Sequence, residues 1–332
     1  MLDSRGNELP LEARPLVRWP DGSVKVALLD TEGPRHGGQG WARLTLEYGY
    51  EVSRSPVRDG VTVSETPGGL LVDNGVWQVR FDREASGLFT SVVEAGEELT
   101  RPDAPARITL VDDAGNVYDT LGSVEGLVVE EAGPLRTVIR ADGHHTGDAG
   151  ELFSYQIRFT FYQGAPGIVM SYRWGNDRSE EEFTKFRRIR LELPLALDDG
   201  SQASVGADEM AGGSLAEGVR LEQLHDDSYT VGDQKGERAP GWIVVWDSEH
   251  YASLVCPHFW QLYPKAIGAE DGMLYLDICP FPRQFHYNDC SELDLIKLYY
   301  YLQDGRYKVR QGVTKIHEVM VTFGTEVLFR RI

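Results

Sequence analysis

The sequence predicts an all-β protein, a large antiparallel β-sandwich preceded by a small β domain. Short apolar runs recur along the 332 residues, and no stretch keeps a helical period. Aromatic residues make up 10% of the chain, while 36 glycines and 16 prolines supply frequent turns. Because strands favour aromatic side chains and tight turns favour glycine and proline, this composition also indicates β structure.

The amino-terminal part of the chain predicts a β-hairpin. A Pro-Asp-Gly turn at residues 20–22 joins the runs Leu16–Trp19 and Val24–Leu29. If the Trp19 indole is buried beneath this turn, its replacement by alanine should cost about 3–5 kcal/mol. Another alternating run follows at Trp41–Tyr50.

Turn signals divide the chain into two expected domains. A Thr-Pro-Gly-Gly segment at residues 66–69 follows a polar interval. We therefore expect a small, incomplete barrel-like β domain at residues 1–66 and the sandwich at residues 67–332. Alternation is clearest at Arg187–Leu195, where isoleucine and leucine share one face and arginine and glutamate the other. The main strands expected in the sandwich are Val76–Phe81, Leu88–Val93, Arg107–Val111, Val124–Glu130, Leu135–Ala141, Leu152–Tyr162, Ile168–Trp174, Trp242–Trp246, Met273–Cys279, Leu293–Leu302, Tyr307–Gln311 and Lys315–Phe323.

One part of the expected sandwich shows no strand pattern. Residues Asp198–Gly241 are polar and rich in glycine, with little periodicity. We expect them to form a long connection, and a connection of this length inside a compact domain is usually functional or mobile.

Charge and cysteine content narrow the classes of ligand. The formal net charge of −19 argues against nucleic acid and anionic membranes as partners, because the long-range field repels both. The three cysteines, at positions 256, 279 and 290, form neither a disulfide framework nor a zinc-binding pattern. We therefore expect no metal site and no cofactor.

The first residues, MLDSRGNELPLEARP, carry charges and no apolar run of the kind found in a signal peptide. No run in the sequence approaches the length of a transmembrane helix. We expect a cytoplasmic protein, or a secreted one if a signal peptide has been trimmed.

The stretch Gly241–Tyr287 is the strongest candidate for a binding surface. Between two apolar runs it carries large side chains with polar tips, and we expect five of them to bind substrate: His258, Trp260, Gln261, Tyr263 and Lys265. Aromatic faces stack on sugar rings, and rigid side chains lose little entropy on binding, so the segment indicates a carbohydrate ligand. The alternative is that the aromatic residues only pack in the core.

Several segments together resemble one family. RPLVRWPDGSVKVALLD at Arg14–Asp30, HFWQLYPKAI at His258–Ile267 and GVTKIHEVMVTF at Gly312–Phe323 are similar to segments of the exo-rhamnogalacturonan lyase or YetA-like proteins. The segments Glu130–His145 and Phe159–Trp174 resemble the central β-sandwich of that family. The resemblance implies a carbohydrate-active protein and covers most of the chain.

The resemblance also implies a further domain. In that family an α/α toroid follows the sandwich, and the substrate cleft is expected to lie between the two. This sequence contains the sandwich segments without a toroid, so we expect a toroid-bearing partner or a homo-oligomer to complete the cleft. The alternative is a non-catalytic carbohydrate-binding protein, or a purely structural β-sandwich.

The implied reaction is cleavage of a uronate-containing, rhamnogalacturonan-like oligosaccharide or polysaccharide by β-elimination. One group neutralises the carboxylate, a base removes the C5 proton and an acid protonates the leaving oxygen. We assign Arg283 to the carboxylate and His286 to the base. The acid is Tyr287 or Tyr263, because these residue types suit the role.

Other polar clusters have simpler explanations. The sequence ADGHHTGD at residues 141–148 contains possible metal ligands, but a polar hairpin loop explains it better, because nothing there fixes a ligand geometry. His317 and Lys315 share one strand face, which fits a half-buried structural histidine.

The assignment of the base is open to a direct test. The variant His286→Ala should stop formation of the unsaturated product, because no other group assigned here removes the C5 proton. Ultraviolet absorbance of the product measures the rate, and unchanged turnover would contradict the assignment.

Overall fold

The computed structural model describes residues 1–33, 43–101, 103–122, 124–178, 182–197, 200–208, 211–282 and 306–325. All regular elements in these ranges are β-strands and bridges, which confirms the predicted fold class. Within the same ranges, no helix has the length and apolar character needed to cross a membrane.

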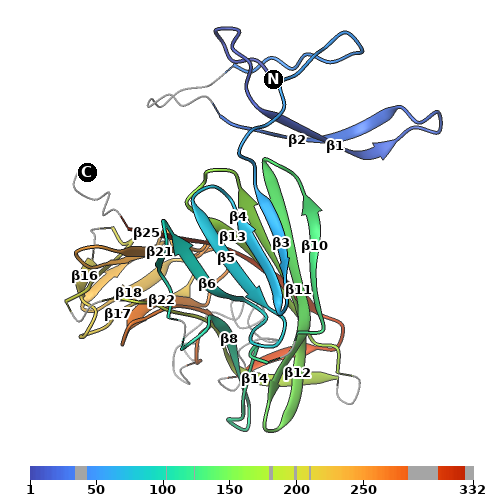
Figure 1. Cartoon of the computed structure of the whole chain (residues 1–332). Helices are drawn as coiled ribbons and strands as arrows, with labels where there is room; N and C mark the ends of the chain where they lie inside the picture. Colours follow the sequence, from blue (N-terminus) through green and yellow to red (C-terminus); the bar gives the residue numbers. More distant parts are fainter. Residues whose placement is uncertain are drawn as a thin grey trace.

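The predicted amino-terminal hairpin is present. Strands β1 (Leu11–Arg18) and β2 (Val24–Thr31) pair antiparallel and stand above the sandwich in Figure 1. The Trp19 indole is not buried beneath the turn, because half of the residue is exposed and the Lys25 Nζ atom lies 4.2 Å from the centre of a Trp19 ring. The expectation of a large cost for its removal therefore does not apply.

Ion pairs join the hairpin to the sandwich. The Arg14 guanidinium lies 2.6 Å from a Glu131 carboxylate oxygen, and the Arg136 Nε atom lies 3.2 Å from Asp30. Glu12 also accepts a hydrogen bond of 3.2 Å from the backbone N–H of Leu135. The contact is thus polar, and on the side of the sandwich it is made by residues 131–136.

A small sheet follows the hairpin in chain order. Its five antiparallel strands are β3 (Thr62–Thr66), β4 (Gly69–Asp73), β5 (Trp77–Asp82), β6 (Phe89–Glu94) and β7 (Glu97–Glu98). Strand β3 precedes the expected domain boundary and pairs with β4 beyond it.

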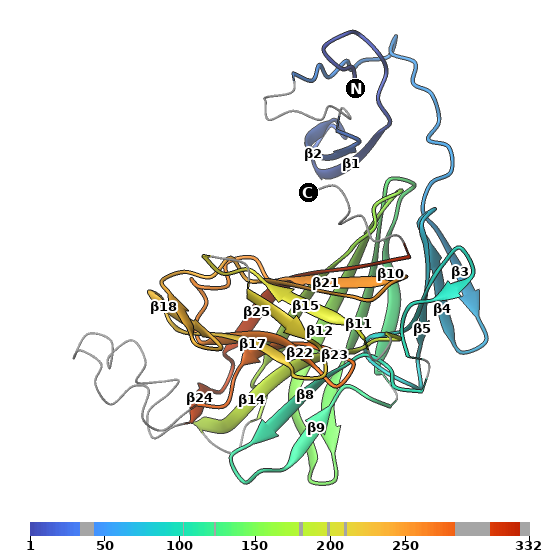
Figure 2. The same cartoon turned by 90° about the vertical axis from the view of Figure 1, so that its left-hand side faces the viewer.

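The remaining strands form two layers of one continuous, 18-stranded hydrogen-bonded system (Figure 2). The pairings define a first layer in the spatial order β10 (Gly126–Ala132), β11 (Arg136–Gly147), β12 (Gly150–Tyr162), β13 (Ile168–Gly175), β25 (Thr314–Gly324), β21 (Tyr251–Val255), β20 (Trp242–Trp246), β15 (Gln202–Val205) and β16 (Ala211–Ser214).

The second layer runs in the spatial order β9 (Val117–Asp119), β8 (Arg107–Asp112), β14 (Phe183–Pro194), β23 (Met273–Cys279), β22 (Lys265–Glu270), β17 (Val219–His225), β18 (Ser228–Val231) and β19 (Gln234–Gly236). Strand β24 (Tyr307–Arg310) pairs with the first half of β14. Strands β15 to β19 lie within Asp198–Gly241, so the expectation of a long connection there was wrong. These strands are only three to seven residues long, too short for the alternation to be recognised.

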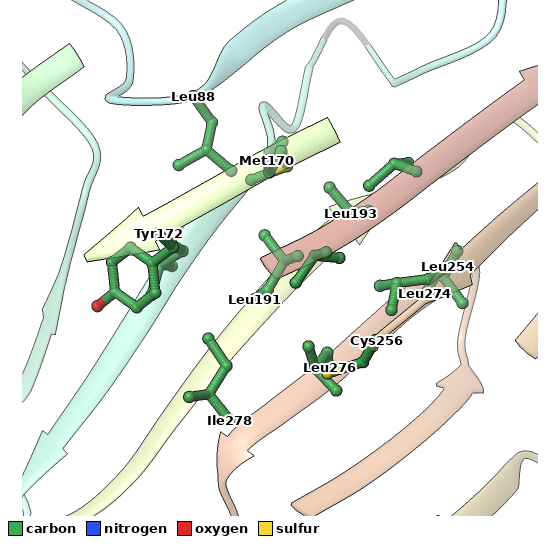
Figure 3. Packing of buried hydrophobic residues seen from close by; sticks show 14 of the residues in the cluster. Leu88, Met170, Tyr172, Leu191, Leu193, Leu254, Cys256, Leu274, Leu276 and Ile278 are labelled. Atoms are coloured by element: carbon green, nitrogen blue, oxygen red, sulfur yellow. The ribbon is translucent and has the colours of Figure 1, made fainter. Parts of the chain in front are cut away.

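Apolar side chains fill the space between the layers. The isoleucine and leucines that alternate along β14 are all buried, as the sequence predicts. Figure 3 shows two of them, Leu191 and Leu193, near Met170 and Tyr172 of β13 and Leu276 of β23. Aromatic rings connect the small sheet to the first layer, and the Phe81 and Phe159 centroids are 4.9 Å apart.

One histidine is part of this core. His145 on β11 is fully buried, donates from Nδ1 to the backbone oxygen of Phe153 at 2.8 Å and accepts at Nε2 from the Tyr172 hydroxyl at 2.9 Å. Burial lowers the pKa of His145 to about 4, because a charged imidazolium is poorly solvated there. The histidine is therefore neutral at physiological pH.

The two tryptophans Trp19 and Trp77 make a matched test of the packing. Trp77 is completely buried and meets Phe323 edge to face, so Trp77→Ala should lower the free energy of unfolding by about 3–5 kcal/mol. Trp19→Ala should cost less than about 1 kcal/mol, because the indole is half exposed. Urea unfolding measures both, and equal losses would contradict the exposed position of Trp19.

The buried histidine predicts a pH dependence. The unfolded chain binds a proton at His145 below about pH 6.5, whereas the folded chain does not until about pH 4. The free energy of unfolding of the wild type should therefore fall relative to that of His145→Gln as the pH is lowered from about 6.5 to about 4. The relative loss should reach about 3 kcal/mol. Unfolding titrations at several pH values measure the difference, and a constant difference would show that His145 titrates normally.

Candidate functional site

A pocket of about 470 Å³ opens where the two layers approach each other. One part of its lining is apolar and comes from the second layer: Phe186, Ile278, Tyr307 and Val309. The other part carries polar atoms and comes from β13, β25 and the turn before β22: Trp174, Gln261, Tyr263, Lys315 and His317.

The pairing of β13 with β25 places three of these polar residues together. Trp174 lies opposite Lys315, and Tyr172 lies opposite His317. Because side chains two residues apart on a strand point the same way, Lys315 and His317 share the face that carries the buried Val319 and Val321. Strand alternation thus directs a lysine and a histidine toward the interior.

A buried lysine lies behind this histidine. Lys265 is the first residue of β22 and is fully buried. Its Nζ atom donates to the backbone oxygen of Ile278 at 3.3 Å and lies 3.2 Å from the His317 Nδ1 atom. Burial lowers the pKa of Lys265, and the nearby positive charge of Lys315 lowers it further.

His317 is held as a neutral imidazole with a defined tautomer. Burial keeps the pKa of His317 well below its usual value, and the charges of Lys265 and Lys315 act in the same direction. An amine or ammonium at Lys265 has hydrogens to donate, so we assign His317 Nδ1 as the acceptor and Nε2 as the N–H group. This Nε2 atom and the Nε1 atom of Trp174 are buried and have no hydrogen-bond partner in the described part of the chain.

The nearby thiols are unreactive. Burial raises the pKa of Cys279 to about 11 and also raises that of Cys256, so both thiols stay protonated at neutral pH. Among the described residues, one group has the spacing of metal ligands, and its members, Glu97, Glu249 and His250, do not line this pocket.

The residues predicted to bind substrate occupy different positions. Gln261 and Tyr263 line the pocket, whereas Lys265 reaches it only through His317. His258 is exposed in a turn with a positive φ of 57°. Trp260 is half-buried, with the Arg238 guanidinium 4.4 Å from its ring centre, and it does not line the pocket.

The residues predicted to be catalytic, Arg283, His286 and Tyr287, lie outside the described residues. The alternative metal ligands do not come together, because β11 continues through residues 141–147 as a strand. His145 faces the core, whereas His144 lies between Glu125 and Asp177 on the other face. Trp174 was not predicted to line a pocket, because in the sequence it is only one residue of an alternating strand.

Part of the sandwich matches a known domain family. Residues 61–221 match the family model of the PcRGLX-like protein central beta sandwich domain. The match supports the resemblance at the level of this domain family and covers the small sheet and much of both layers.

Solved structures that are similar to this chain have low sequence identity and low TM-scores. The Slr1438 protein from Synechocystis sp. PCC 6803 is 12% identical, with 83% of this chain and all of that chain covered and a TM-score of 0.46. An alpha-mannosidase from Enterococcus faecalis is 10% identical, with 78% and 30% covered and a TM-score of 0.49. A galactose mutarotase-like protein from Clostridium acetobutylicum is 7% identical, with 81% and 100% covered and a TM-score of 0.47. These likenesses are too distant to indicate a function, and no curated protein matches the sequence significantly.

The electrostatics of the pocket predict a shift in one variant. Replacing Lys315 with glutamine removes a positive charge that lowers the pKa of His317, so the His317 pKa should rise. Nitrogen-detected NMR of the imidazole measures the titration. Lys235→Gln, a change of the same charge at an exposed position outside the pocket, is the control and should leave the His317 pKa unchanged.

Proposed function

We propose that this chain is a carbohydrate-active protein that recognises uronate-containing, rhamnogalacturonan-like oligosaccharides at the pocket formed by Gln261, Tyr263, Lys315 and His317. The proposal rests on one observation: two segments that are distant in sequence line the same pocket. The turn before β22 and the strand β25 both resemble segments of the lyase family, and they are about fifty residues apart in sequence. The match of residues 61–221 to the sandwich domain supports the same family.

The lining suits a sugar acid. The apolar part includes the exposed side chains of Leu262 and Ile316, which offer a surface for the carbon face of a sugar ring. Gln261 and Tyr263 offer groups that hydrogen-bond to hydroxyls, and Lys315 supplies a positive charge. The pocket therefore combines the three kinds of contact that an acidic sugar needs.

Cleavage by β-elimination is the reaction that we propose for the active form. Tyr263 lines the pocket, and we propose that its hydroxyl protonates the leaving oxygen, which is one of the two alternatives that the sequence left open. Arg283 and His286 remain the proposed carboxylate-binding residue and base. A toroid-bearing partner or a second copy of the chain would supply the other wall of the cleft.

One observation favours binding without cleavage as the second candidate. The His317 Nδ1 atom is already paired with Lys265, and Lys265 itself is fully buried. The Nδ1 lone pair of His317 is therefore occupied, and Lys265 does not line the pocket. The pocket residues described here thus serve recognition, and the base must come from elsewhere.

Substitution of Gln261 tests the proposed pocket. Gln261→Ala removes an exposed pocket amide, and we expect rhamnogalacturonan oligosaccharides to bind about fivefold to tenfold more weakly, as for the loss of one neutral hydrogen bond. The control is Gln234→Ala, at another exposed glutamine outside this pocket, and its affinity should match the wild type. Calorimetry measures the affinity.

The same samples distinguish the two candidate functions. Binding together with ultraviolet-absorbing unsaturated product supports the lyase, whereas binding without product supports the non-catalytic protein. Absence of binding to any of the oligosaccharides, by the chain alone and by its complex with a toroid-bearing partner, would refute the proposal.

A further inference from the structure

We propose that the amino-terminal hairpin is a dimerisation element, through which two copies of this chain pair along the outer edge of β2. The two hairpins then form one four-stranded sheet, with the two β2 strands side by side at its centre. The contact includes five large exposed side chains, which we call the hairpin surface: Leu16, Val17, Val24, Val26 and Leu29. None of them lines the pocket described above, so dimerisation and oligosaccharide binding are separate properties.

The amino-terminal segment has no core of its own. None of the residues 1–33 and 43–60 is buried. Eleven of the 19 large apolar side chains that are exposed in the described part of the chain nevertheless lie in this segment. A two-stranded hairpin is marginally stable at best in water, and stable sheets have more strands and a covered apolar face. The segment therefore presents an apolar surface of the kind that marks an interface.

The two faces of the hairpin differ in character. Glu12, Arg14 and Asp30 share one face, and all three side chains contact the sandwich. The opposite face carries four uncharged side chains, all exposed: Ala13, Pro15, Ala27 and Leu29. The charges on the first face are thus paired within the chain, whereas the opposite face suits an apolar partner.

The outer edge of β2 is open to strand pairing. One edge of β2 pairs with β1, and no described residue pairs with the other. The eight residues of β2, VKVALLDT, include no proline, whereas β1 contains Pro15, which has no N–H to donate. A long apolar edge strand without proline is a template for another strand. We therefore place the contact at β2 and not at β1.

The distribution of charge favours a second copy at this place. Residues 1–60 contain 8 lysines and arginines against 9 aspartates and glutamates, a net charge of −1, so the remaining 25 and 43 give residues 61–332 a net charge of −18. The hairpin stands clear of the sandwich in Figure 1. Two copies that meet through their hairpins bring nearly neutral segments together and keep the acidic sandwiches apart, which limits their repulsion.

The exposed area is sufficient for a weak dimer. The hairpin surface and the five large exposed apolar side chains at residues 44–52 together expose on the order of 1,000 Å². Burial of about half of this area on each copy reaches the total of roughly 1,000 Å² that a specific interface needs. Two identical antiparallel strands are related by a twofold axis, so the contact closes at the dimer. We expect a Kd on the order of 10 μM.

Sedimentation velocity of the full chain tests the dimer. The wild type should change from monomer to dimer between about 1 and 200 μM. Val26→Lys places a charge on the edge strand and should weaken dimerisation at least about tenfold, while the exposed position of Val26 leaves the monomer folded. The control is Val117→Lys, at an exposed valine of strand β9, which should dimerise like the wild type.

Hydrogen exchange locates the contact. Backbone amides within Val24–Thr31 should exchange more slowly at about 200 μM than at about 1 μM, because the new strand pairing protects them. Val26→Lys should abolish this dependence on concentration, and Val117→Lys should keep it.

Three results would overturn the inference. The first is a wild type that stays monomeric at about 200 μM, alone or while its hairpin binds a toroid-bearing partner instead. The second is a dimer that Val26→Lys leaves intact. The third is a dimer in which the β2 amides exchange as fast as in the monomer, because the two copies then meet through another surface.

Discussion

The contact between Lys265 and His317 joins two layers that otherwise meet through apolar side chains. Lys265 begins β22 in the second layer and His317 lies on β25 in the first, so their hydrogen bond exists only when the layers are packed in this register. The pocket depends on that packing, because its lining comes from both layers. The tautomer of His317, and with it the chemistry that the pocket offers, follows from the same contact.

Burying these polar groups is costly for the fold. Burial removes solvation from both side chains and lowers the pKa of each. The charge of Lys315 lowers both pKa values further, and that of Lys265 also lowers the pKa of His317. The rest of the core is well packed, with aromatic pairs such as Phe186 and Tyr307 at 4.9 Å. Buried polar side chains that destabilise an otherwise apolar, well-packed core are typical of functional sites, because the chemistry of the site requires them.

The outer face of the second layer shows the opposite arrangement. Asp277 is fully buried and is paired with the Arg190 guanidinium at 2.6 Å and with Arg220 at 2.7 Å. Both guanidinium groups also lie beside the Tyr275 ring, at 3.9 and 5.7 Å from its centre. These charges satisfy one another, so this face supports the sheet, whereas the Nε1 atom of Trp174 and the Nε2 atom of His317 have no hydrogen-bond partner in the described part of the chain.

The sequence by itself determined the fold class, the amino-terminal hairpin and the buried face of β14, because strand alternation and Pro-Asp-Gly turns are local patterns. It also identified the segment that contains Gln261 and Tyr263. Only the tertiary structure showed that Trp19 is exposed, that short strands fill residues 198–241, and that Trp174, Lys315 and His317 meet at one pocket. Burial and long-range pairing depend on which strands become neighbours, and pairings such as that of β13 with β25 join residues more than one hundred positions apart, beyond the reach of any local pattern.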